Sequence, residues 1–203
     1  EHGVVAVVQS KEYVNINDLK DRFSHIFKEL FISRYRFIEV NLENNDHIVK
    51  LRDIIHKISL QIYKTEKSKQ EVSKVEVDHV FPVKGIGTVI LGRVRSGKIS
   101  KGSRVLVLPT QRTCIVKSIQ INDIDYNSAS FGSRVGLALR GILPKDVRRG
   151  YILTSDLDGW VIRNKIKIKL KTVPFAKLPE VGKTRHIVIG LQAIPAVVSS
   201  IKA

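Results

Sequence analysis

The chain has 203 residues, of which 43% are hydrophobic, and its formal net charge is +16 at pH 7 with a pI of about 10.1. That hydrophobic content is enough to build real cores, which excludes a basic disordered tail. The single cysteine, Cys114, excludes an internal disulfide and a thiolate metal cage, and no apolar run is long enough to span a bilayer, so the sequence favours an intracellular, cytoplasmic protein.

The first 63 residues alternate between strand and helix patterns. Val4–Val8 is a short apolar run typical of a buried parallel strand, and a helical stripe of apolar residues follows over residues 16–30. Arg36–Leu42 repeats the strand pattern, and residues 48–62 repeat the helical stripe. This order predicts an α/β sheet, for which two strands are too few. Residues 1–63 are therefore expected to be the C-terminal half of a larger α/β domain whose beginning lies outside the chain.

A polar stretch at residues 64–74 is expected to be a linker, and after it the hydrophobic period changes from helical to two. Several short β-runs, punctuated by Gly, Ser, Asp and Asn, fill residues 75–155. Because no helical stripe interrupts them, these residues are expected to form a small all-β barrel.

Residues 156–203 contain further β-runs but are too few for a complete barrel, so a partial third β domain is expected. Within it, four lysines alternate with three apolar residues, as in a half-buried strand with one basic face: Lys165, Lys167, Lys169 and Lys171 against Ile166, Ile168 and Leu170. Such a stripe is either a solvated edge strand protected by lysines or a weak nucleic-acid-binding ridge.

The positive charge is unevenly distributed over these segments. Residues 1–70 carry 12 basic and 10 acidic side chains, residues 71–155 carry 14 and 6, and residues 156–203 carry 9 and 3. Charge concentrated in part of a chain favours a polyanionic partner, most often nucleic acid. The alternative is a basic surface that serves only solubility.

The stretch GRVRSGKIS at residues 92–100 has the appearance of a phosphate-binding loop with one position changed. Gly92 and Gly97-Lys98 have the required spacing, but Ile99 stands where Ser or Thr would hold magnesium. An alternating strand pattern follows it, whereas a phosphate-binding loop opens a helix. We therefore interpret Ser96-Gly97 as the turn of a β-hairpin and not as a nucleotide site.

Two long runs, VDHVFPVKGIGTVILGRV and SRVGLALRGILPKDVRRGYIL, carry a specific resemblance over residues 75–154. They resemble the second domain of translational GTPases of the elongation factor Tu type. The Asp-His pair before Phe81 is similar to selenocysteine-specific elongation factors (SelB), and HGVVAVV and HIVIGLQ resemble an archaeal group similar to that factor, in which the GTPase domain is degenerate. The resemblance implies an α/β remnant of a P-loop-type G domain, an elongation factor Tu domain II-like barrel and a partial third β domain.

Factors of this family bind aminoacyl-tRNA and the ribosome, so the resemblance implies these partners. Carried over by position, Asp78, His79, Phe81 and Arg140 would line the pocket for the aminoacyl end. Asp78 could pair with the ester's amine, and His79 and Arg140 could face an acidic side chain such as a selenolate. The alternatives are a surface strand residue for His79 and a salt bridge at the barrel end for Arg140.

The guanine-binding motifs of the family are altered in this chain. The loop after GVVAVV, with Gln9, Ser10, Lys11 and Glu12, does not match N-K-x-D in any alignment, and Asn41-Leu42-Glu43 stands in place of S-A-K. We therefore expect GTP binding to be lost or altered. GTP and Mg²⁺ are expected as cofactors only if an intact G domain lies upstream.

Three functions remain open. The favoured one is a translation elongation factor-like protein that binds the aminoacyl end of a tRNA. The second is a functional GTPase elongation factor whose nucleotide motifs lie upstream, and the third is a module that docks on the ribosome or on a partner. The six histidines have no metal-ligand spacing, and no catalytic residue is expected within the chain.

Overall fold

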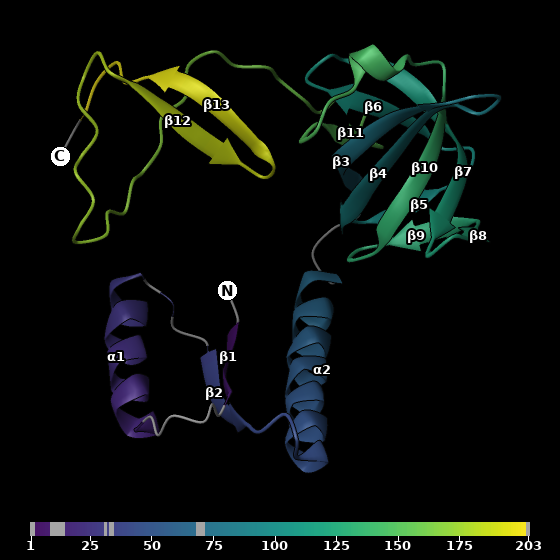
Figure 1. Cartoon of the computed structure of the whole chain (residues 1–203). Coiled ribbons are helices and arrows are strands. Elements are labelled where there is room, and N and C mark those ends of the chain that lie inside the picture. Colours follow the sequence, from purple (N-terminus) through teal and green to yellow (C-terminus); the bar gives the residue numbers. More distant parts are fainter. Residues whose placement is uncertain (1–2, 9–14, 31, 33–34, 68–71, 202–203) are drawn as a thin grey trace. The chain divides into compact units, whose positions relative to one another are not determined.

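The computed structural model describes residues 3–8, 15–30, 32, 35–67 and 72–201 (Figure 1). It divides into two compact units, residues 1–62 with 168–178, and residues 63–167 with 179–203. Among the described residues, no helix is long and apolar enough to cross a membrane.

The first unit contains two parallel strands joined through a helix. β1 (Gly3–Val8) pairs with β2 (Tyr35–Val40) in register, and α1 (Ile16–Glu29) provides the crossover that a parallel pair requires. Aromatic rings connect helix and strand, since Phe27 lies 4.6 Å from Tyr35 between ring centroids. The α/β expectation for this part of the chain is confirmed.

The second helix, α2 (Asn45–Lys67), follows β2 after a short turn. Its start is defined by Asn44, whose side-chain oxygen accepts a hydrogen bond from the Asp46 N–H at 2.9 Å. The helix extends through Lys67 and so covers the first part of the segment 64–74 that was expected to be a linker.

Six antiparallel strands form a closed barrel in the second unit. Their order is β10–β4–β3–β11–β6–β7, and pairing of β7 with β10 closes the ring. The bounds are β3 (Lys74–Val83), β4 (Gly87–Ser96), β6 (Arg104–Leu108), β7 (Arg112–Ile121), β10 (Arg134–Arg140) and β11 (Ile152–Thr154). β8 (Ile124–Tyr126) extends β7, β5 (Lys98–Ser100) pairs with β9 (Ser128–Ser130), and η1 (Pro144–Asp146) is a single 3₁₀ turn. The expected all-β barrel is confirmed.

The barrel is filled by aliphatic side chains from the inward positions of its strands. Val75 and Val77 of β3, Ile90 of β4, Leu137 of β10 and Leu153 of β11 are fully buried. The period of two in the sequence is the direct cause, because alternate residues of a strand face opposite sides of the sheet.

The expected hairpin at Ser96-Gly97 is wrong. β5 does not pair with β4; instead the chain bends at Gly97 and β5 pairs with β9. Gly97 has φ +60°, and a Cβ there would lie 2.7 Å from the Val72 backbone, so glycine is required by close packing rather than by a hairpin turn. Strands flank Gly97 on both sides, which agrees with rejecting a phosphate-binding loop.

The last segment contains one antiparallel hairpin, β12 (Thr184–Ile189) with β13 (Gln192–Val197). The half-buried strand expected around Lys165–Lys171 is wrong, because these residues form no strand and their side chains are exposed. Ile166, Ile168 and Leu170 are each more than half exposed. No described strand pairs with this stretch, so its alternating apolar residues have no sheet on which to pack.

Candidate functional site

A β-bulge at Asp78 turns two consecutive polar residues toward the same side of the barrel. Val77 lies opposite Gly92 and His79 lies opposite Leu91, so Asp78 is the extra residue with no partner on β4. Before the bulge, Val75 and Val77 face the core, and after it Val80 packs against the core. Asp78 and His79 therefore both lie on the outer face, where strict alternation would have turned one of them inward.

Gly92 allows the two strands to approach each other beside the bulge. A Cβ at this position would lie 2.5 Å from the carbonyl oxygen of Glu76 and 3.1 Å from the Val75 side chain. Because the first contact is with backbone, only a residue without a side chain fits.

The Asp78 carboxylate is the centre of a small charge cluster. Its Oδ1 lies 3.4 Å from Arg149 Nε, and its Oδ2 lies 3.5 Å from Arg134 Nη2 and 3.3 Å from His79 Nδ1. Arg134 begins β10 and Arg149 lies in the loop before β11, so three segments distant in sequence converge here. One carboxylate faces two guanidinium groups, which leaves positive charge in excess even when His79 is neutral.

Aromatic surface adjoins this cluster on the same face. The rings of His79 and Phe81 are parallel, with centroids 6.0 Å apart and 3° between the planes, and Phe81 is 38% exposed. Across β4, Leu91 lies beside Gly136, where the missing side chain leaves the surface open. The arrangement offers a flat apolar platform next to excess positive charge.

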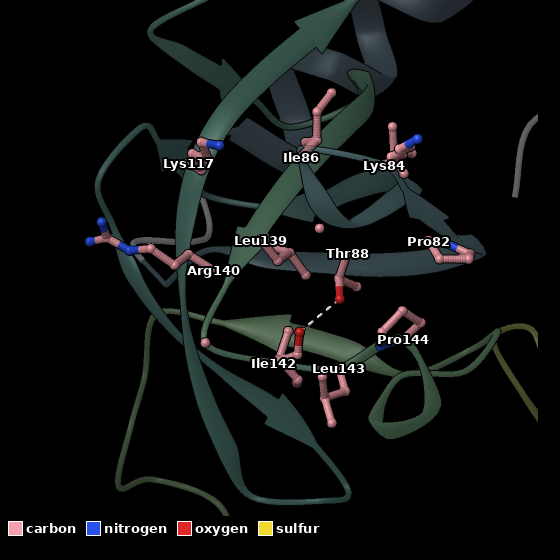
Figure 2. Close-up of a pocket in the computed structure, with 13 residues that line it drawn as sticks. Pro82, Lys84, Ile86, Thr88, Lys117, Leu139, Arg140, Ile142, Leu143 and Pro144 are labelled. Carbon is pink, nitrogen blue, oxygen red and sulfur yellow. Dashed lines mark hydrogen bonds between the residues drawn. The ribbon is translucent and has the colours of Figure 1, made fainter.

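Arg140 does not join Asp78, His79 and Phe81. It ends β10 six residues after Arg134, which corresponds to roughly 20 Å along an extended strand. It lines a separate cleft between the β3–β4 turn and the segment after β10 (Figure 2). Arg134 stands in the cluster where Arg140 was expected, and Arg149 joins it.

The sequence contained only an indirect signal for Arg134. It lies in the run SRVGLALR, on which period-two alternation places residues 134 and 140 on one face of the strand. Which of the two lies beside Asp78 depends on the pairing of β10 with β4 and of β4 with β3, and register is not encoded in alternation.

The expected guanine-binding segments are only partly described. Gln9, Ser10, Lys11 and Glu12 lie outside the described residues. In the second segment, Asn41 Oδ1 accepts a hydrogen bond from the Glu43 N–H at 2.9 Å, and the Asn41 N–H donates to His47 Nδ1 at 3.0 Å. The Asn41 side chain is thus engaged within its own turn.

Among the residues that the structure describes, no group of three or more His, Cys, Asp or Glu side chains is arranged to hold a metal ion. The four lysines of the expected ridge, Lys165, Lys167, Lys169 and Lys171, are exposed but belong to no strand. They therefore do not form a one-sided stripe.

Comparison with known proteins agrees with the barrel. Residues 87–154 match the family model described as elongation factor Tu domain 2. The chain is 39% identical to an uncharacterized protein of Methanocaldococcus jannaschii over 129 residues, covering 63% of the chain and 41% of that protein. It is 28% identical to the selenocysteine-specific elongation factor of the same organism over 200 residues, covering 96% of the chain and 42% of the relative.

Solved structures agree with these sequence matches. Translation elongation factor SelB from Methanococcus maripaludis superimposes with a TM-score of 0.72 in its apo form and 0.76 in complex with the GTP analogue GppNHp, at 25% and 26% identity. Each match covers 96% of the chain, and 42% and 44% of SelB. The resemblance to translational GTPases of the elongation factor Tu type, on the SelB-like side, is confirmed. The chain spans about two fifths of the length of these relatives.

Proposed function

We propose that this chain, whose barrel belongs to the elongation factor Tu domain 2 family, is part of a translation factor that holds the aminoacyl end of a tRNA. The partners of the complete protein would be an aminoacyl-tRNA and the ribosome. The observation that carries the proposal is the outward-facing Asp78 between Arg134 and Arg149, next to the parallel rings of His79 and Phe81.

The chemistry of this surface suits an aminoacyl end with an acidic side chain. The exposed ring of Phe81 provides the kind of face on which an unpaired base stacks. Asp78 already faces two arginines, so its remaining role is to orient them while their excess positive charge receives an anionic group. A selenolate is such a group, and the match to a selenocysteine-specific factor supports it.

We further propose that guanine recognition in this chain is lost or altered. The family's S-A-K segment is replaced by Asn41-Leu42-Glu43, where the Asn41 side chain is engaged with the Glu43 N–H. A side chain committed to its own turn is not available to contact a base. Aminoacyl-end binding is therefore proposed without a requirement for GTP within this chain.

The test is protection of the aminoacyl ester. The same tRNA is charged with selenocysteine or with serine, which differs in lacking the anionic selenolate, and spontaneous ester hydrolysis is followed with and without protein and with and without GTP and Mg²⁺. We expect slower hydrolysis for the selenocysteinyl ester. Arg134→Ala should weaken this protection about tenfold, since a hydrogen bond to a charged group contributes about 1.5–3 kcal/mol.

Arg104→Ala is the matched control, because it removes an exposed arginine of β6 that forms no ion pair among the described residues. It should leave protection unchanged. Loss of protection in Arg140→Ala but not in Arg134→Ala would return Arg140 to the aminoacyl pocket. Equal hydrolysis with and without protein, for both esters, would overturn the proposal.

A further inference from the structure

One end of the barrel carries a cleft that the aminoacyl-end proposal does not use. Its walls are the turn from Pro82 to Thr88 and the segment from Leu139 to Pro144, and its volume is about 630 Å³. It shares no lining residue with the Asp78 cluster. Figure 2 shows the two walls facing each other across the cleft.

The two walls are connected by a buried hydrogen bond. Thr88 is 2% exposed, and its Oγ1 donates to the Ile142 carbonyl oxygen at 2.7 Å (Figure 2). A buried bond of this length holds the segments at a defined separation. The cleft therefore exists before any ligand arrives, which lowers the ordering cost of binding.

The interior of the cleft is aliphatic. Its apolar lining residues are Pro82, Val83, Ile86, Leu139, Ile142, Leu143 and Pro144, and none of the lining residues is aromatic. Ile86 and Leu143 are 46% and 55% exposed. Large aliphatic groups left this exposed gain free energy when an apolar group covers them.

The charged residues of the cleft are all positive. Lys84, Lys117 and Arg140 line it, their side chains are exposed, and no acidic residue is among the lining residues. None of the three forms an ion pair with any described acidic residue. In Figure 2 the Arg140 guanidinium points away from Leu139 and Thr88, so its charge lies beyond the aliphatic interior.

From this combination we propose that the cleft docks an acidic peptide segment of a partner protein, with one aliphatic side chain inserted between the walls. The flanking carboxylates face Lys84, Lys117 and Arg140. A single-stranded nucleic acid would also satisfy the charges, but bases are held by stacking on aromatic side chains, and this lining offers none. A peptide uses both the aliphatic interior and the positive rim.

Fluorescence anisotropy with a labelled synthetic peptide tests this directly. The peptide carries one leucine flanked on both sides by aspartates and glutamates, and a second peptide has serine in place of the leucine. The first should bind saturably, and the serine peptide should bind about tenfold more weakly. Leu143→Ser, at an exposed position, should reduce the difference between the two peptides.

Charge contributes through position as well as number. The double variant Lys117→Ala/Arg140→Ala should weaken binding about tenfold. The control double variant Lys98→Ala/Arg104→Ala removes the same total charge from exposed positions outside the cleft and should bind as the unmodified chain does. Circular dichroism and thermal unfolding of every variant establish that the barrel is folded.

Three results would overturn the proposal. One is the absence of saturable binding by the folded chain, and another is equal binding of the leucine and serine peptides. The third is an oligoribonucleotide of equal charge that displaces the peptide and binds equally to the two double variants, since that pattern identifies a diffuse RNA-binding surface. Because Arg134 lies outside the cleft, failure of ester protection leaves this proposal standing, and the reverse also holds.

Discussion

Cys114 illustrates how a single residue responds to its place in the barrel. It lies on β7, is 3% exposed, and belongs to the aliphatic core of the barrel. Burial raises the pKa of the Cys114 thiol from 9.0 to about 11, because the thiolate would lose its hydration. The thiol is therefore a small apolar core group and not a nucleophile.

This placement makes the stability of the barrel depend on pH in the alkaline range. The folded-state pKa of Cys114 lies above the unfolded one, so its contribution is fully present below pH 9 and decreases as the pH rises from 9 to about 11, by at most about 1.4 kcal/mol per pH unit. Denaturant unfolding at several pH values should show this loss, while Cys114→Val, which has no titrating group, should lack it. Rapid labelling of the native thiol by iodoacetamide at pH 8 would contradict the assignment.

At the scale of one element, β3 depends on its bulge and on the glycine opposite it. A Cβ at Gly92 would press on the Glu76 carbonyl, whereas a Cβ at Gly136 on β10 would meet nothing closer than a Leu91 methyl group at 3.6 Å. Gly92→Ala should therefore destabilise the barrel by about 1–3 kcal/mol, the range for overpacked sites. Gly136→Ala should cost less than about 1 kcal/mol in the same denaturation experiment. Equal destabilisation by the two variants would mean that β3 and β4 separate easily beside Asp78.

Elements with a strong local pattern were predicted from the sequence, whereas their partners were not. The helical stripes and the period-two runs led to α1, α2 and the barrel strands because burial of one face is a local requirement. The hairpin at Gly97 and the strand at Lys165–Lys171 were wrong because pairing depends on what lies alongside. The same limit affected the site: resemblance brought together Asp78, His79 and Phe81, but the choice between Arg134 and Arg140 required strand register.

Across the whole barrel, the two proposed surfaces are separated along the length of β10, with Arg134 at its start and Arg140 at its end. The strand thus connects a charge cluster suited to an anionic aminoacyl group with a cleft suited to an acidic peptide. Most of the excess charge of the chain lies after residue 70, and these surfaces give part of it a specific position. The two proposed sites can accordingly be tested by substitutions that do not overlap.

The barrel also contacts the β12–β13 hairpin through one carboxylate. Glu76 is 7% exposed, its Oε1 accepts a hydrogen bond from the Leu191 N–H at 3.0 Å, and its Oε2 lies 3.6 Å from Arg95 Nε. Gly190 has φ +56°, and a Cβ there would overlap the Glu76 carboxylate, so the hairpin turn fits closely around this group. A carboxylate this deeply buried is stable only while its partners remain in place.

Substitution of Glu76 should therefore free the hairpin without unfolding the barrel. In Glu76→Ala, hydrogen exchange at the Leu191 amide should become faster by about tenfold or more, while the amides of β4 and β10 keep their protection, because the lost acceptor serves only the hairpin turn. Glu76→Gln is the matched control, since its amide oxygen still accepts from Leu191 although the ion pair with Arg95 is removed. Unchanged Leu191 exchange in Glu76→Ala would show that the hairpin is held by other contacts, and faster exchange throughout the barrel would show that Glu76 supports the barrel itself.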